Sequence, residues 1–286
     1  MRTTDPIPLP NDITQTVRRA LAEDVGGGDI TGALLPAHLS ASATLISRED
    51  AILCGIPWFD EVFAQLDPGI KTHWTATDGA DITVEQTICR LTGPARPLLT
   101  GERTAINFLQ TLSGTATVAA KYAREARGTP ARILDTRKTL PGLRTAQKYA
   151  VRRGGCHNHR LGLHDGILIK ENHILAAGSL PAAVGLARGK NPDVPVEVEV
   201  ESLEECRAAL ASGADIILLD NFSLQAIEEA VRVTAGRAKL EVSGGVERST
   251  LGRLAQTGVD YISIGSLTKH VRAVDFSLRF QISGTP

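Results

Sequence analysis

The sequence predicts an α/β protein with an antiparallel N-terminal domain followed by a larger domain built on a parallel sheet. The chain has 286 residues, 42% of them hydrophobic, which is more than one compact domain usually needs. From about residue 131, a short β-branched run, a polar or glycine tip and an amphipathic helical stretch follow one another repeatedly. Residues 40–100 instead contain short strand-like stretches separated by Gly and Pro turns.

The N-terminal part is expected to combine helices with an antiparallel sheet. Ala105, Leu109 and Leu112 recur at helical spacing, which predicts a helix over residues 101–113. Another helix is expected over residues 12–23. Gly and Pro turns separate the candidate strands, which cover residues 43–47, 71–77 and 82–91.

The second part contains six strand-and-helix units. Parallel neighbours need a crossover connection, so the alternation of strand and helix implies a parallel sheet. Ser202-Leu-Glu-Glu205 is a capping box that opens one crossover helix, and Gly213 is placed to close it. Six units are enough to curl into a barrel, although an open doubly wound sheet would give the same pattern. The predicted strands cover residues 131–134, 166–169, 196–200, 215–219, 239–242 and 261–264.

Composition argues against several classes of function. Lys and Arg (31) balance Asp and Glu (32) to a net charge of -1, so no basic field is present to hold nucleic acid or an anionic membrane. Only 4% of residues are aromatic, which argues against base stacking. The sequence shows no apolar signal core and no long apolar run, so we expect a cytoplasmic protein without a membrane partner. The four cysteines lie far apart, which suggests neither disulfides nor a cysteine zinc site.

Chemistry-bearing residues follow the predicted strands. Catalytic residues of barrels and open α/β sheets gather at the carboxyl ends of the strands. Here the first two strand ends carry cations, the next two carry carboxylates and the last two carry glycine-rich turns. In chain order these ends are Asp135–Lys138, Lys170–His173, Glu199 with Glu201, Asp220–Asn221, Ser243–Gly245 and Gly265–Ser266.

A cluster of cations predicts an anion site. Arg137, Lys138, Arg160 and Lys170 lie at strand ends or in a Gly-rich turn, where backbone can approach a ligand and arginine can bind a carboxylate with two hydrogen bonds. Other cations of the same stretch, spaced along a helical segment, are instead predicted to lie on a solvated helix face. They are Arg144, Lys148, Arg152 and Arg153.

The last two strand ends and the carboxylates indicate phosphate and a metal ion. Ser243-Gly-Gly245 and Gly265-Ser266 offer backbone N–H groups to an anion, although a glycine in such a turn often has no ligand. In residues 196–201 valines and glutamates alternate, which fits an exposed edge strand or an interior-facing Glu199, with Glu201 as a second candidate. Together with Asp220, these oxygens suit Mg²⁺ bound through a substrate phosphate.

Two other interpretations are less favoured. Cys156, His157 and His159 resemble metal ligands, but adjacent donors on a tight turn do not readily converge, and no fourth ligand is apparent. Lys170 could form a Schiff base, but among other cations it serves equally well as an anion clamp.

In order along the chain, these motifs closely resemble the quinolinate phosphoribosyltransferase family. The resemblance rests on Asp135–Arg144, Gly154–Leu163 and shorter motifs that run nearly from end to end. The shorter motifs include Leu21–Asp24, Gly28–Thr31, Gly101–Thr104, Leu168–His173, Glu197–Glu199, Leu218–Asn221, Ser243–Gly245 and Ile264–Ser266. Cys156 departs from the pattern, where a third glycine is usual, and so does Lys269-His270, where a His-Ser pair is more usual.

The resemblance implies an N-terminal α/β sandwich over residues 1–113, completed by the tail 273–286, and a six-stranded α/β barrel over residues 114–272. It also implies a homodimer whose sites are shared between subunits. The implied reaction belongs to NAD biosynthesis. Quinolinate and 5-phosphoribosyl-1-pyrophosphate give nicotinate mononucleotide, CO₂ and pyrophosphate, with Mg²⁺ as the cofactor.

The family motifs also assign roles to residues at matched positions. Those implied to hold quinolinate are Arg103, Arg137, His159, Arg160 and Lys170. Those implied to face the phosphoribosyl pyrophosphate are Thr136, Lys138, Glu199, Asp220, Ser243, Gly244, Gly245, Ile264, Gly265 and Ser266. Lys138, Glu199 and Asp220 are the implied catalytic residues, and the last two are candidate protein ligands of Mg²⁺.

Two alternatives remain at this stage. A related phosphoribosyltransferase-like protein associated with molybdenum transport shares the barrel, but Arg137-Lys138 with Asn158-His-Arg160 speaks against it. A non-catalytic module that senses a phosphorylated anion would need the cations but neither Glu199 nor Asp220. Binding without turnover would identify such a module.

Overall fold

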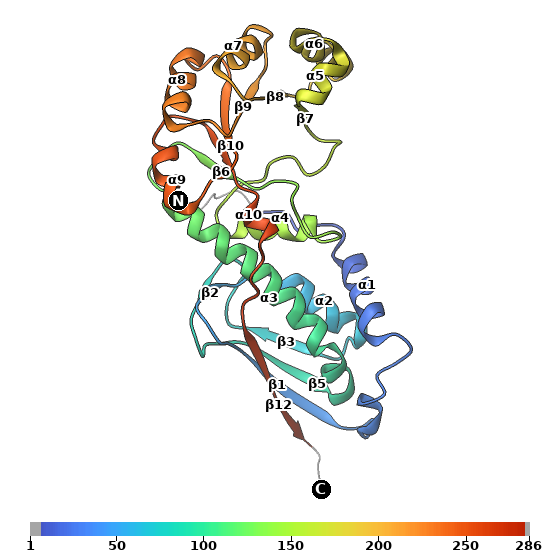
Figure 1. Cartoon of the computed structure of the whole chain (residues 1–286). Coiled ribbons are helices and arrows are strands. Elements are labelled where there is room, and N and C mark those ends of the chain that lie inside the picture. Colours follow the sequence, from blue (N-terminus) through green and yellow to red (C-terminus); the bar gives the residue numbers. More distant parts are fainter. Residues whose placement is uncertain (1–6, 284–286) are drawn as a thin grey trace. The chain divides into compact units, whose positions relative to one another are not determined.

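The structure is a computed structural model that describes residues 7–283 and divides into two compact units (Figure 1). The first unit takes the chain up to Ala120, residues 139–155 and the chain from Leu267 onward. The second unit takes residues 121–138 and 156–266. The boundary expected at residues 113 and 114 falls inside helix α3 (Ala95–Glu125), which extends in both directions beyond the helix predicted for residues 101–113.

The first unit is built on an antiparallel sheet that the C-terminal strand completes. The strand order is β12 (Phe276–Ser283), β1 (Ser40–Ser47), β5 (Thr87–Pro94) and β3 (Lys71–Trp74). β12 pairs with β1 along its whole length, from Ser40 opposite Ser283 to Ser47 opposite Phe276, and Figure 1 shows the two strands side by side. A second pair is formed by β2 (Ala51–Ile52) and β4 (Asp81–Ile82).

Helices α1 (Ile13–Val25), α2 (Ile56–Leu66) and α3 also belong mainly to this unit, with a short 3₁₀ turn at Gly32–Leu34. Trp58, Phe59 and Phe63 of α2 are almost fully buried and belong to a hydrophobic cluster that also contains residues of the sheet and of α3. Asp78 stabilises the start of α2 because one of its carboxylate oxygens accepts the N–H groups of Gly55 and Ile56 at 3.0 and 3.1 Å.

Residues 139–155, which carry helix α4 (Arg144–Arg153), pack with the first unit. The Tyr149 hydroxyl donates to Asp78 at 2.9 Å, and its ring lies 5.4 Å from that of Trp58. Lys148 is only 1% exposed, so placing it on a solvated helix face was wrong. The aliphatic stem of a lysine packs in an apolar environment when its ammonium finds polar partners.

The second unit contains a parallel sheet of six strands. In chain order the strands are β6 (Arg132–Leu134), β7 (Ile167–Ile169), β8 (Val196–Val200), β9 (Ile216–Asp220), β10 (Lys239–Ser243) and β11 (Tyr261–Ser263). Their spatial order is β6, β11, β10, β9, β8, β7. The pairing of β6 with β11 joins the first strand to the last, which an open doubly wound sheet would not do. The unit is therefore barrel-like, as the resemblance implied.

β6 and β7 do not pair with each other in residues 7–283. The segment around His157, which lies between them in the sequence, forms a short parallel bridge with β6. The N–H of His157 donates to the carbonyl of Ile133 at 2.8 Å, and the N–H of Asp135 donates to the carbonyl of His157 at 3.0 Å. This pairing fixes the Gly-rich turn against the end of β6. Asn158, His159 and Arg160 follow His157 directly and therefore lie near the end of this strand.

The crossover helices are α5 (Glu171–Ala177), α6 (Leu180–Lys190), α7 (Leu203–Ala211), α8 (Leu224–Thr234) and α9 (Arg248–Ala255), with α10 (Ser266–Lys269) after β11. Serine side chains cap the starts of α6, α7 and α8, and the cap of α7 at Ser202 is the one that the sequence predicts. Ser202 accepts the Glu205 N–H at 3.2 Å, while the Glu205 carboxylate accepts from Glu201 rather than from Ser202. Within the described part of the chain, no helix is both long and apolar enough to cross a membrane.

Gly114, inside α3, generates a stability prediction. A Cβ at this position would overlap the carbonyl oxygen of Arg272, in the segment that leads into β12. Replacing an exposed helical Gly by Ala usually stabilises a protein by up to about 1 kcal/mol. We expect Gly114→Ala to destabilise the protein by about 1–3 kcal/mol instead, measured by chemical denaturation.

Gly185, in α6, is the matched control because nothing lies within 4 Å of a Cβ built there. Gly185→Ala is expected to be neutral or stabilising. Equal effects of the two substitutions would contradict the close packing of α3 against residues 272–273.

Candidate active site

Strand register places several predicted side chains on one face of the parallel sheet. Glu199 of β8 and Glu241 of β10 both pair with Leu218 of β9, so all three side chains point to the same face. Asp220 and Ser243 are register partners at the carboxyl ends of β9 and β10. The predicted residues of the fourth and fifth strand ends are therefore neighbours. Glu201 is exposed, whereas Glu199 is half-buried.

Lys170 and Glu199 form an ion pair at the ends of neighbouring strands. Lys170 Nζ donates to Glu199 Oε2. The backbone N–H of Lys170 also donates to His173 Nδ1 at 3.0 Å, which fixes the start of α5. One residue expected to bind quinolinate therefore contacts one expected to face the phosphoribosyl group.

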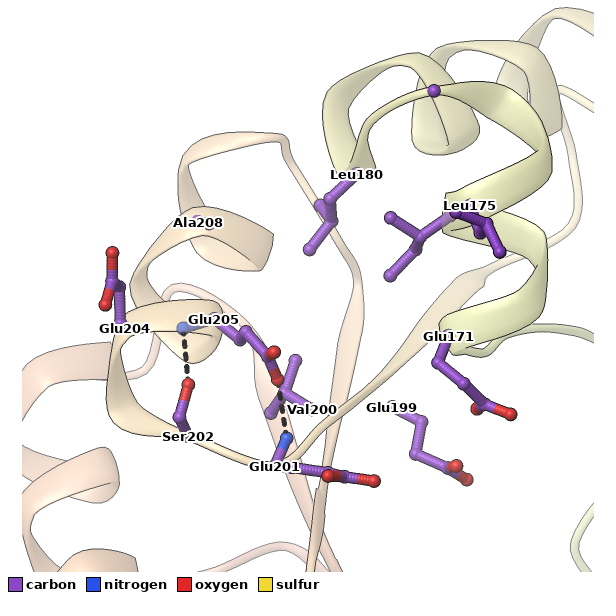
Figure 2. Close-up of a pocket in the computed structure, with 12 residues that line it drawn as sticks. Glu171, Leu175, Leu180, Glu199, Val200, Glu201, Ser202, Glu204, Glu205 and Ala208 are labelled. Carbon is purple, nitrogen blue, oxygen red and sulfur yellow. Dashed lines mark hydrogen bonds between the residues drawn. The ribbon is translucent and has the colours of Figure 1, made fainter.

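Glu199 also borders a pocket of 780 Å³ between α5 and α7 (Figure 2). Leu175 and Leu180 form part of its apolar wall. Figure 2 shows carboxylates on both sides of the pocket, Glu171 on α5 and Glu204 and Glu205 on α7. Such a wall repels an anion, so an anionic substrate is expected on the Lys170 side of Glu199. The carboxylates of the wall are those of Glu171, Glu199, Glu201, Glu204 and Glu205.

Asp135, at the end of β6, positions the turn that carries His159. Its side chain is fully buried. One carboxylate oxygen accepts the backbone N–H of His159 at 2.9 Å, and the other accepts the Asn158 amide at 2.6 Å. A buried carboxylate with these donors fixes the turn in one conformation.

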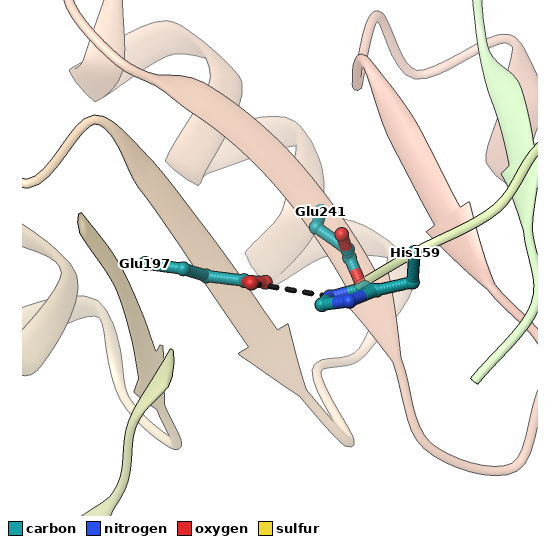
Figure 3. Close-up of side chains that lie close together, drawn as sticks. All are labelled: His159, Glu197 and Glu241. Atoms are coloured by element: carbon teal, nitrogen blue, oxygen red, sulfur yellow. Dashed lines mark ion pairs between the residues drawn. The ribbon is translucent and has the colours of Figure 1, made fainter. Parts of the chain in front are cut away.

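The imidazole of His159 lies between two buried glutamates (Figure 3). Its Nε2 is 3.1 Å from Glu197 Oε2 and 3.5 Å from Glu241 Oε1. Its Nδ1 accepts the backbone N–H of Arg160 at 2.7 Å. Both ring nitrogens are therefore engaged within the chain.

Arg137 and Arg160 form the cationic part of the site. Burial, together with the positive charge of Arg137, lowers the pKa of Arg160 from its ordinary value. Arg160 Nη1 donates to the carbonyl of Gly166 at 3.0 Å. Arg137 Nε is buried and has no hydrogen-bond partner among the described residues. Two neighbouring guanidinium groups, one with a buried unused donor, are suited to a carboxylate ligand.

The glycine-rich strand ends have the conformations that the sequence indicates. Gly244 has a φ of +90°, and a Cβ there would lie 2.6 Å from Asn221 Cγ, so a side chain is excluded. At Gly265 a Cβ would lie 3.0 Å from Lys138 Cδ. The Lys138 side chain therefore lies against the last strand end. Thr136 Oγ1 accepts the Lys138 N–H at 3.1 Å, and Ser266 Oγ lies 3.3 Å from the Tyr122 hydroxyl.

The remaining predicted quinolinate ligand, Arg103, belongs to the first unit. It is exposed on α3, beside Glu102. Burial raises the pKa of Glu102, and the charge of Arg103 lowers it. Within the second unit, the structure brings Arg137, Arg160, His159, Lys170 and Glu199 to the same side of the sheet.

Glu241 is the residue that sequence reasoning missed, and Glu197 entered only as part of a family motif. Together with His159 they form the only group of three or more potential metal ligands in residues 7–283, with their ligand atoms within 4.8 Å of one another. Cys156 and His157 lie outside it, and burial raises the pKa of Cys156 to about 12. The available signal for Glu241 was a lone carboxylate between Leu240 and Val242, the two apolar residues of β10.

The buried glutamates generate a prediction about pH. Burial, and then the negative charge of Glu197, raise the pKa of Glu241 from 4.5 to about 7, while His159 opposes this. The folded protein therefore binds this proton more tightly than the unfolded chain does. Between these pKa values the unfolded chain ionises while the folded protein keeps its proton, and this costs the folded state stability as pH rises.

Glu241→Gln removes this cost, so its stability relative to the wild type should improve from about pH 5 to about pH 8 by on the order of 1–3 kcal/mol. Chemical denaturation of both proteins across this range measures the difference. Exposed Glu228, on α8, supplies the control Glu228→Gln, for which no such trend is expected. A difference that shrinks or stays constant with rising pH would contradict the assignment.

Comparison with known proteins agrees with this geometry. The family model for the quinolinate phosphoribosyl transferase N-terminal domain matches residues 29–113, and the model for the C-terminal domain matches residues 115–279. A nicotinate-nucleotide pyrophosphorylase [carboxylating] of Mycobacterium leprae is 44% identical over 272 residues, covering 92% of this chain and 95% of that protein. A probable enzyme of the same name from Bacillus subtilis is 40% identical and covers 91% of each chain.

Solved structures give the same result. The nicotinate-nucleotide pyrophosphorylase of Francisella tularensis superposes with a TM-score of 0.93 at 47% sequence identity, covering 98% of this chain and all of that one. The two family models together span both units and include every candidate site residue described above. The chain belongs to the quinolinate phosphoribosyltransferase family.

Proposed function

We propose that this chain transfers the phosphoribosyl group of 5-phosphoribosyl-1-pyrophosphate to quinolinate, giving nicotinate mononucleotide, CO₂ and pyrophosphate in NAD biosynthesis. The observation that carries the proposal is the neighbouring pair Arg137 and Arg160, in the same compact unit as Lys170 at the end of β7. Quinolinate has two adjacent carboxylates, and these cations match them in charge. Relatives named for this reaction cover nearly the whole chain.

The phosphoribosyl side of the site is assigned to the last two strand ends. Ser243–Gly245 and Ile264–Ser266 present backbone N–H groups where a 5-phosphate would bind. Lys138 lies against Gly265 and can approach the pyrophosphate from the same side. Cations on the β6 side and glycine turns on the β10 and β11 side then hold the two substrates next to each other.

Glu199 and Asp220 fit the proposed Mg²⁺. Glu199 pairs with Leu218, two residues before Asp220, so both carboxylates point to the same face at the ends of paired strands. Mg²⁺ prefers oxygen ligands and commonly uses one or two carboxylates together with substrate phosphates. When bound, Mg²⁺ would neutralise negative charge on the pyrophosphate leaving group.

The side chains also fit the proposed chemistry. Departure of pyrophosphate leaves positive charge on the ribose ring, which the carboxylates of Glu199 and Asp220 can stabilise. The pyridine nitrogen then attacks C1 of the ribose. The positive charge of the resulting pyridinium stabilises the electron pair that remains on ring C2 as the 2-carboxylate leaves as CO₂, and C2 then takes up a proton from water. The protein's main contribution is to hold both substrates in a reactive orientation.

Incubation with quinolinate, 5-phosphoribosyl-1-pyrophosphate and Mg²⁺ tests the proposal. Nicotinate mononucleotide and CO₂ should appear in equal amounts, and omission of Mg²⁺ should abolish turnover. Binding of both substrates without product would identify a non-catalytic module instead and would overturn the proposed reaction.

The charged pocket predicts strong discrimination between pyridine acids. Nicotinate lacks one of the two carboxylates, so its binding would leave a desolvated guanidinium without a partner. We expect kcat/KM for nicotinate to be lower than for quinolinate by at least about a hundredfold. Steady-state kinetics with each acid as the varied substrate measure this ratio, and comparable values would contradict the two-carboxylate pocket.

We further propose that the active unit is a homodimer in which Arg103 acts on the site of the partner subunit. Arg103 is exposed and belongs to a different compact unit from Arg137, Arg160 and Lys170. The family resemblance implies that the N-terminal domain of one subunit covers the barrel mouth of the other. A lone subunit would then hold an incomplete site.

Subunit mixing tests the shared site. Arg103→Ala and Lys138→Ala should each inactivate the enzyme, while each mixed dimer regains one site with both wild-type residues. With random, equimolar exchange about half of the dimers are mixed, so about a quarter of wild-type activity should return. If Arg103 acts within its own subunit, none returns. Mass-tagged subunits confirm that exchange has occurred.

A further inference from the structure

His159 is held through both ring nitrogens, and the groups that hold it lie beneath the proposed quinolinate pocket. We propose that Glu197 is a positioning residue that, with Glu241 packed beside the ring, clamps the His159 imidazole and thereby fixes the main chain of Arg160. Neither glutamate was assigned a role in binding by the family motifs. The inference deepens the proposed function, because Arg160 is one of the expected quinolinate ligands.

The hydrogen bonds define the state of the ring. Nδ1 accepts the N–H of Arg160 at 2.7 Å, so this nitrogen carries no proton. The proton of the neutral ring therefore lies on Nε2, which faces Glu197 Oε2 at 3.1 Å. A rotation of the ring would break the contact with Glu197 and the one with the Arg160 backbone together. The ring thus links the Glu197 carboxylate to the backbone of Arg160, so a fixed Glu197 holds this backbone in place.

The burial of the two glutamates is difficult to explain by stability alone. Glu197 and Glu241 are 4% and 1% exposed. Glu197 Oε1 is buried and has no hydrogen-bond partner within residues 7–283. Two buried carboxylates near each other cost folding free energy through desolvation and repulsion. A geometric role at the site accounts for this cost.

The groups around the clamp come from each element packed against it. Glu197 lies on β8, Glu241 on β10 and Ser263 on β11, while Asp135 holds the His159 backbone from the end of β6. The negative charge of Glu197 also acts on Arg160, where it opposes the lowering of the Arg160 pKa. The clamp therefore places negative charge within electrostatic reach of the guanidinium that is expected to bind a carboxylate.

A metal ion is the main alternative occupant of this cluster, because its ligand atoms lie within 4.8 Å of one another. A metal would require the lone pair of Nε2. In the hydrogen-bonded arrangement described here that nitrogen carries the proton and points it at Glu197. The geometry therefore favours the clamp, and metal binding becomes an outcome that would overturn it.

Kinetics of three variants test the clamp. Glu197→Leu keeps the side-chain volume but removes the acceptor, whereas Glu197→Gln keeps an oxygen that can accept from Nε2–H. Loss of one hydrogen bond to a charged group is expected to raise the KM for quinolinate about tenfold in Glu197→Leu. Glu197→Gln should restore it, Glu228→Gln should match the wild type, and the KM for 5-phosphoribosyl-1-pyrophosphate should stay unchanged in all three. A wild-type KM for quinolinate in Glu197→Leu, or an equal rise for both substrates, would overturn the clamp.

A second measurement uses the wild-type enzyme and does not depend on turnover. The chain has 7 histidines, and ¹⁵N-histidine labelling with His159→Gln identifies the signals of this ring by NMR. We expect Nε2 to be protonated and Nδ1 to be an unprotonated acceptor near neutral pH. A ring protonated on Nδ1, a rapidly averaging ring, or loss of the Nε2 proton on adding Zn²⁺ would overturn the clamp. If quinolinate is not turned over, the proposed function fails, while this spectrum still decides the clamp.

Discussion

The pairing of β6 with β11 is the interaction on which the candidate site depends. It brings the end of the first strand of the parallel sheet beside the end of the last. Lys138 therefore lies against Gly265, although more than a hundred residues separate them along the chain. The same arrangement leaves β6 free on its other side for the turn that carries His159 and Arg160. Without this closure, the cationic and glycine-rich strand ends would lie at opposite edges of a sheet.

Charge is layered within the second unit. Arg137, Arg160 and Lys170 supply positive charge at or near the strand ends, whereas Glu197 and Glu241 are carboxyl groups buried further back along β8 and β10. The charge of Glu197 offsets part of the effect that the positive charge of Arg137 has on Arg160.

Much of the second unit could be predicted from the sequence, because its strands are short apolar runs and its helices carry local caps. All six predicted strands are present to within one residue at each end. The closure of the sheet by the pairing of β6 with β11 could not be predicted from sequence periodicity. Periodicity indicates local secondary structure but does not show which strands pair. The closure entered through the family resemblance, and so did the role of Arg103. Glu241 was missed because a single carboxylate in a strand normally indicates a solvent-facing position. Lys148 was wrongly predicted to be solvated because a charged residue at helical spacing normally faces water, whereas here its side chain is buried.

The division of the chain into units also bears on how the protein is made. The first unit is assembled from three separate stretches, and its hydrophobic cluster includes Tyr149 as well as Val274, Phe276 and Leu278 near the C-terminus. A ribosome delivers those last residues only after the whole parallel sheet has emerged. The N-terminal unit therefore cannot complete its core during synthesis, and its exposed β1 edge must wait for β12. Until β12 has emerged, the nascent chain presents an unpaired edge strand, which makes this interval the one in which chaperone protection would matter most.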